Sequence, residues 1–405
     1  MPLLKLNNLT PASLRQISPP LLFELLSPYA EFFRRSGYPQ FPATPPAADD
    51  DTALDCDAVY RLVLSTEHDC PEKLDEALFF INRVADRSHG PILAAAAEKA
   101  DPPLEFDEEA SAADLAVLLW LRSPRLLEAL HAEEHIDQER AHTFFICGKS
   151  QPPPLSFRRL TEEDLDRLGA SLAPWFAKRG RGRACRVFKF ERKDAIWFMI
   201  RHGDLVQRHA TYSLKTHQES SSRFRPQVHD SIVFRPHTGE LGICAPGLQL
   251  LREYTRLMGR VLFGDETYFR VFTKYSLEPL RAGPSCLELL SPDEDIAWAS
   301  LTRVTFTHPG RVAEKVTLAC SDVFDFLSRS ALQIPPGAIH SATLRVQFHD
   351  GGGPRDFLIN SASKARHFED QCHLALEGFL LRRGFIVPAP QPRDDAPTQL
   401  DMVAV

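Results

Sequence analysis

A dense group of basic residues follows a predicted helix near the middle of the chain. It consists of Lys178, Arg179, Arg181, Arg183 and Arg186, with Gly180 and Gly182 between them, and Arg223 and Arg225 extend it. Arginine donates paired hydrogen bonds to phosphate oxygens, and glycine leaves the backbone free to follow a phosphate chain. The basic segment 178–193 therefore predicts contact with nucleic acid, although a solvated loop between a helix and a strand has the same composition.

A second candidate centre is the string Phe198-Met199-Ile200-Arg201-His202-Gly203. An apolar strand that leads into Arg-His-Gly resembles the signature of the histidine phosphatase superfamily. The resemblance implies that His202 is the phosphorylated nucleophile, that Arg201 binds phosphate, and that His349 is the second histidine. Imidazole attacks phosphorus while guanidinium groups neutralise the phosphate oxygens. The alternative interpretation is a turn between two strands at residues 202–204.

The string His131-Ala132-Glu133-Glu134-His135 has the spacing H-x-x-E-H and resembles the inverted zinc peptidases. The resemblance implies that His131 and His135 bind zinc and that Glu134 acts as the general base. Glu128, His131, His135, Glu139 and His142 follow one another at steps of three or four residues. This spacing predicts one polar helix face about 21 Å long. Because such a stripe cannot converge on one ion, the sequence favours an exposed polar face without metal, and we expect no cofactor.

The elements that position these groups change in character along the chain. Residues 1–150 have apolar side chains at helical spacing and predict a helical module with a Pro-rich acidic linker at 39–51. A buried helix face is predicted at Leu74, Ala77, Leu78, Ile81 and Val84. A helix over 124–143 ends the predicted module, and Pro152-Pro153-Pro154 marks its boundary because three prolines cannot join a helix or a central strand.

Beyond this boundary, alternating strands and hairpins replace the helical pattern. The sequence predicts an α+β module over 155–280 and a second one over 281–385, and it leaves open whether these form one domain or two. Residues 386–405 are rich in Pro, Asp and Gln and predict a flexible tail. The predicted fold class is therefore α+β, with an acidic all-helical N-terminal module followed by one or two modules with antiparallel hairpins.

The charge of the chain is unevenly divided. Residues 1–150 hold 13 Lys and Arg against 25 Asp and Glu, whereas the remaining residues hold 34 against 29. Nucleic acid should therefore avoid the acidic first part. Eight scattered cysteines without a C-x-x-C pair, and no signal-like or long apolar segment, predict a cytoplasmic protein with no membrane contact.

The sequence contains no complete catalytic constellation, which favours recognition over turnover. It predicts a non-catalytic interaction subunit of a larger bacterial cytoplasmic assembly, such as an antiviral defence complex. This subunit would contact partner proteins, and nucleic acid through residues 178–193. The alternative is a phosphohydrolase that uses Arg201, His202 and His349.

Overall fold

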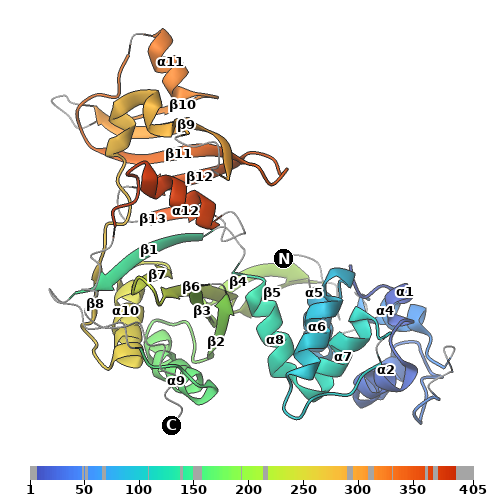
Figure 1. The fold of residues 1–405 in the computed structure, drawn as a ribbon. Coiled ribbons are helices and arrows are strands. Elements are labelled where there is room, and N and C mark those ends of the chain that lie inside the picture. The colour runs from blue at the N-terminus through green and yellow to red at the C-terminus, as the bar shows by residue number, and fades with distance from the viewer. Residues whose placement is uncertain are drawn as a thin grey trace. The chain divides into compact units, whose positions relative to one another are not determined.

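The computed structural model describes residues 7–47, 50, 53–65, 70–107, 109–136, 140–148, 157–192, 194–212, 218–289, 295–308, 314–330, 332–360, 364–367 and 373–388 (Figure 1). The chain folds into two compact units. Unit 1 comprises Met1–Glu134 and Leu205–Pro226, and unit 2 comprises His135–Asp204 and Gln227–Val405. The combination of helices with antiparallel sheets confirms the predicted α+β class.

The first part of unit 1 is a set of short helices around one apolar core. They are α1 (Pro11–Leu14), α2 (Pro19–Leu26), η1 (Ser27–Tyr29), α3 (Ala30–Arg35), α4 (Cys56–Val63), α5 (Glu72–Val84), η2 (Arg87–His89), α6 (Gly90–Glu98), α7 (Ala112–Arg122) and α8 (Pro124–Glu133). Hydroxyl groups cap two of them: Thr10 accepts from the Ser13 N–H, and Ser111 accepts from the Asp114 N–H. The five residues predicted to form the buried face of α5 are all buried.

The described part of the Pro-rich segment 39–51 packs within unit 1. Phe41 is buried and its ring stacks on Phe33 with centroids 5.1 Å apart. Just before the segment, the Tyr38 hydroxyl accepts a 2.8 Å hydrogen bond from the Asp55 N–H, next to the start of α4. The segment therefore acts as a loop fixed to the core of unit 1.

Unit 2 is built on one eleven-stranded sheet. Its strands are β1 (Arg140–Cys147), β2 (Cys185–Arg192), β3 (Ala195–Gly203), β6 (Gln227–Arg235), β7 (Glu240–Cys244), β8 (Phe269–Val271), β9 (Ile296–His308), β10 (Glu314–Ala319), β11 (Ile339–Phe348), β12 (Arg355–Asn360) and β13 (Lys364–His367). The order is β10-β9-β11-β12-β13-β1-β7-β6-β3-β2, with β8 paired to β1. One sheet thus contains strands from both predicted α+β segments.

Strand β1 joins the two halves of this sheet. It pairs with β7 along one edge, and along the other edge with β13 and then with β8. The predicted helix over 124–143 is therefore wrong in its second part, since α8 ends at Glu133 and the backbone is extended from Arg140. The predicted boundary at 152–154 lies outside the described residues.

Two apolar cores lie on opposite faces of the sheet. Phe144 and Phe145 are neighbours in β1, so their side chains point to opposite faces, and each packs in a different core. The Phe145 core includes helices α9 (Glu162–Lys178) and α10 (Leu248–Phe263). The Phe144 core includes η3 (Glu278–Leu287), α11 (Val323–Arg329) and α12 (His373–Arg382). Figure 1 shows α9 and α10 beside β2, β3, β6 and β7.

A buried ionic cluster connects helix α12 to this sheet. Lys274 donates to Glu240 at 2.9 Å and to Glu377 of α12, and Arg235 donates to Glu240 at 2.8 Å. Burial alone would lower the pKa of Lys274, but Glu240, Tyr275 and Glu377 together outweigh burial and the pKa is raised. The two positive and two negative charges of this buried cluster therefore balance.

Three segments of unit 2 differ from the elements that their sequence patterns predict. Residues 266–275 predict a helix but contain the short strand β8, and residues 286–290 predict a strand although residues 286–287 belong to η3. Residues 363–382 predict one final helix but contain β13 before α12. Ile386, at the start of the predicted flexible tail, is buried and bridges to Tyr275. No helix among the described residues is long and apolar enough to span a membrane.

Candidate nucleic-acid interface

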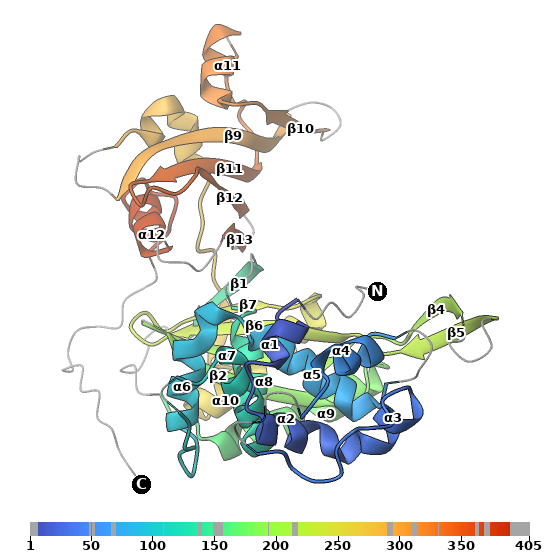
Figure 2. The same ribbon diagram turned by 90° about the vertical axis from the view of Figure 1, so that its right-hand side faces the viewer.

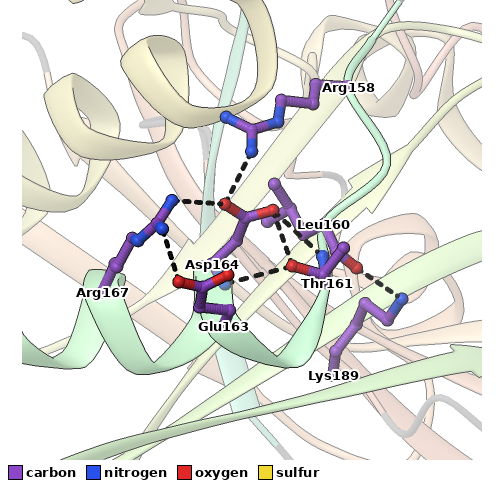
Figure 3. Close-up of polar contacts among 7 residues, drawn as sticks. All are labelled: Arg158, Leu160, Thr161, Glu163, Asp164, Arg167 and Lys189. Carbon is purple, nitrogen blue, oxygen red and sulfur yellow. Dashed lines mark hydrogen bonds and ion pairs between the residues drawn. The ribbon is translucent and has the colours of Figure 1, made fainter. Parts of the chain in front are cut away.

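Helix α9 carries the basic segment at its C-terminal end and is fixed by a capping box at its N-terminal end (Figure 3). Thr161 Oγ1 accepts from the Asp164 N–H at 3.3 Å, and Asp164 Oδ2 accepts from the Thr161 N–H at 3.1 Å. The Thr161 backbone bond, followed by the Thr161 hydroxyl and the Arg158 charge, lowers the pKa of Asp164. The start of α9 is therefore fixed by hydrogen bonds.

Ion pairs and a strand contact reinforce this helix start. Arg158 donates to Asp164 Oδ1 at 2.7 Å, and Arg167 pairs with Glu163 one turn earlier. Lys189 of β2 donates to the Leu160 carbonyl at 3.1 Å, so this lysine of the basic segment is used to join α9 to the sheet (Figure 3).

The glycines of the basic segment form the turn that ends α9. Gly180 and Gly182 have φ values of 75° and 85°, which L side chains rarely adopt. The Gly180 N–H bonds to the Ala177 carbonyl at 3.1 Å, and the Arg181 N–H bonds to the Phe176 carbonyl at 3.0 Å. The Arg-Gly alternation thus has a structural cause, and it presents basic side chains around a tight turn.

The basic side chains at this turn differ in their surroundings. Lys178, Arg179 and Arg183 are exposed, and among the described residues none of them has an acidic side chain within ion-pair distance. Arg181 lies 3.8 Å from Asp204, and Arg186 lies over the Phe188 ring at 5.5 Å. Three cations therefore remain available to an anionic ligand.

Arg179 is held in one orientation by its neighbours. Its guanidinium carbon lies 3.7 Å from the centre of the Trp175 ring, and Nη2 donates to Gln249 Oε1 at 3.2 Å. A guanidinium that is already ordered loses less conformational freedom when it binds a ligand. The sequence prediction included neither Trp175 nor Gln249. Gln249 lies 70 residues from Arg179 in the chain, so no local pattern connects the two.

Arg223 and Arg225 lie on a separate hairpin, in unit 1. Strands β4 (Gln207–Tyr212) and β5 (Glu219–Phe224) form a two-stranded sheet of their own, and Arg225 follows β5 directly. The register places Arg208 opposite Arg223, so the hairpin contains a basic residue that the sequence analysis missed. Arg208, Arg223 and Arg225 are all exposed.

The predicted phosphatase centre is not assembled. Arg201 and His202 are neighbours in β3, so their side chains point to opposite faces and cannot bind one phosphate. His349 follows β11, which is six strands from β3 in the sheet, or roughly 29 Å at about 4.8 Å per strand. The turn that the sequence predicted at 202–204 is only partly correct, since β3 continues to Gly203.

His202 takes part instead in a buried hydrogen-bonded network. Its Nε2 lies 2.9 Å from Asp230 Oδ2, which also accepts from the Tyr254 hydroxyl at 2.8 Å. The ring stacks on Phe176 with centroids 4.0 Å apart. Burial, with a contribution from Asp230, raises the pKa of Tyr254 well above its usual value and that of the Cys185 thiol to about 12. The network joins β3, β6, α9 and α10 inside the core.

The histidines of the predicted zinc motif are also separated by the fold. His131 is buried in α8, where its ring meets Phe79 and Phe80 edge-on. His135 lies after the end of α8 and stacks on His229 with centroids 4.3 Å apart. His142 lies in β1, and Glu139 is outside the described residues. Within the described part of the chain, no three His, Cys, Asp or Glu side chains gather as a metal site requires.

Comparisons with known proteins do not assign the chain to a family. The sequence matches no protein-family model, and it has no significant match among curated proteins. The function must therefore be argued from the site alone.

Proposed function

We propose that this protein is a non-catalytic recognition protein that binds nucleic acid through the basic turn at the end of α9. The observation that carries the proposal is the exposure of Lys178, Arg179 and Arg183 without acidic partners among the described residues. Such cations displace condensed counterions from a phosphate backbone, which supplies most of the free energy of non-specific binding.

The arrangement of the turn supports this proposal. The guanidinium of Arg179 is oriented by Trp175 and Gln249, and Gly180 and Gly182, at positive φ, form the tight turn that carries the basic side chains. Arginine side chains are among the usual donors to phosphate oxygens. The separation of Arg201, His202 and His349 supports recognition over phosphoryl transfer.

The test is the binding of a labelled oligonucleotide by fluorescence anisotropy at two salt concentrations. The R179A/R183A variant should bind more weakly, and the slope of log Kobs against log salt should fall by about two, since each lost phosphate contact removes about one unit. The matched control is R329A/R345A, which removes one exposed and one half-buried arginine that pair with Asp325 and Asp356.

The control changes the net charge by the same amount as R179A/R183A, so it separates a local site from a general charge effect. No binding by the wild-type protein at low salt would overturn the proposal. Equal losses in the two double variants would also overturn it, because the turn would then have no special role.

A further inference from the structure

The β4–β5 hairpin has two chemically different faces. Figure 2 shows the strands side by side as a two-stranded ribbon. Arg208 and Arg223 are opposite each other, so their side chains share one face, whereas Gln207, His209 and Phe224 share the other. On that second face, His209 contacts the Phe224 ring at 5.1 Å and lies 3.2 Å from Gln207 Oε1. The second face is thus occupied by contacts within the hairpin.

The face that carries Arg208 and Arg223 is unfavourable for folding. Like charges directly opposite each other destabilise a strand pair, and an isolated two-stranded sheet is only marginally stable. Both side chains are exposed, and among the described residues neither has an acidic group within ion-pair distance. Because the pair does not stabilise the hairpin, it indicates a role in binding an anion.

The charge of the whole segment complements a polyanion. Residues 205–226 contain four Lys and Arg against one Glu. Arg225 is exposed directly after β5, two residues beyond Arg223, and the acidic Glu219 lies at the other end of β5. The positive charge of the ribbon therefore lies at the end where β4 begins and β5 ends.

We propose that this hairpin inserts into the major groove of double-stranded DNA with its Arg208–Arg223 face toward the duplex. The proposal rests on the nucleic-acid binding proposed above and names the form of nucleic acid. The major groove of B-form DNA is about 12 Å wide and admits a two-stranded ribbon, whereas that of A-form RNA is too narrow.

Single-stranded nucleic acid fits this surface less well. Proteins that bind single strands without sequence preference stack successive bases on several aromatic side chains. The Arg208–Arg223 face carries one aromatic side chain among its described residues, Tyr212, which is 70% exposed and has Glu219 directly opposite. The charge and shape of the hairpin therefore favour the duplex.

The test compares a labelled DNA duplex with one of its strands, using the whole chain. Wild type should bind the duplex about tenfold or more tightly than the single strand. R208A/R223A should lose about tenfold in duplex affinity and keep its single-strand affinity within about twofold. R179A/R183A should weaken binding to both ligands by a similar factor, since its contacts are to phosphate. R208K/R223K keeps the charge and should retain part of the preference.

The outcomes separate this proposal from the preceding one. If R208A/R223A binds duplex as wild type does, or if it weakens both ligands equally, the hairpin does not read the groove and the proposal is overturned. A wild-type preference for the single strand would also overturn it. In each of these cases the turn at the end of α9 can still be tested by R179A/R183A. If wild type binds neither ligand at low salt, both proposals fail together.

Discussion

Individual buried polar groups in unit 2 are held by specific partners. Asp230 illustrates this, because one of its carboxylate oxygens interacts with both His202 and the Tyr254 hydroxyl. A carboxylate inside an apolar core is tolerated only when hydrogen bonds replace its hydration. The histidine that resembles a catalytic nucleophile therefore has a structural role, and its neighbour Arg201 lies on the other face of the sheet.

Replacing Tyr254 by Phe should destabilise the protein by about 1.5–3 kcal/mol. The change removes one hydrogen bond to the buried Asp230 carboxylate and leaves the aromatic packing in place. Urea unfolding followed by circular dichroism measures the difference. Tyr212→Phe, at a residue that is 70% exposed, is the control and should change the free energy by less than about 0.5 kcal/mol. Equal effects of the two changes would contradict the role assigned to Tyr254.

Asp164 should make stability depend on pH. Its pKa is lowered in the folded state, first by the Thr161 backbone bond, so the ionised form stabilises the fold above the unfolded-state pKa. That contribution is lost as the pH falls through the lower folded-state pKa. Asp164→Asn should cost about 1 kcal/mol at pH 7, and its difference from wild type should shrink with acidification. Glu163→Gln, at an exposed carboxylate of the same turn, is the control for urea unfolding across pH.

At the scale of elements, the sequence predicted those helices and turns that contacts between neighbouring residues stabilise. The apolar face of α5 was predicted and follows from residues close in sequence, as do the capping box of α9 and the turn at Gly239, whose φ is 64°. Strand β1 was missed because charged residues at helical spacing run into it from α8. Its extended form depends on pairing with β7 and β13, about 100 and 220 residues away in the chain.

The candidate site shows the same limit. Basic residues at 178–183, 223 and 225 were visible in the sequence because charge is a property of each residue. Arg208 was not chosen, since its meaning depends on the register that places it opposite Arg223. Its one available signal was the strand-like pattern of residues 205–213, close to that second basic pair.

The ionic cluster that joins α12 to the sheet should be sensitive to the loss of one cation. Lys274→Met leaves Glu377 without that partner and should destabilise the protein by about 3–5 kcal/mol, as measured by urea unfolding. K274M/E377Q removes one carboxylate as well and leaves the Arg235–Glu240 pair, so it should recover part of the loss. Lys315→Met, on exposed strand β10, is the control. A double variant no more stable than K274M would contradict this account.

At the scale of the whole molecule, two basic surfaces come from different units of the fold. The turn at the end of α9 belongs to unit 2 and the β4–β5 hairpin to unit 1, although the chain as a whole has a net charge of −7. The proposed binding to a polyanion therefore depends on local concentration of charge and not on the net charge. If both surfaces contact one duplex, their contributions to the binding free energy should add.

The quadruple variant R179A/R183A/R208A/R223A tests this additivity. R179A/R183A should lower the slope of log Kobs against log salt for duplex DNA by about two, because its contacts are to phosphate. R208A/R223A should lower the duplex affinity about tenfold with little change in slope, because its contacts are to the groove, and the quadruple variant should show both losses together. Anisotropy titrations at several salt concentrations give the affinities and the slopes. A quadruple variant that binds the duplex no more weakly than R179A/R183A would contradict this additivity, because losses of binding free energy at separate contacts add. The unchanged circular dichroism spectrum of each variant would show that the lost contacts, and not unfolding, cause the change.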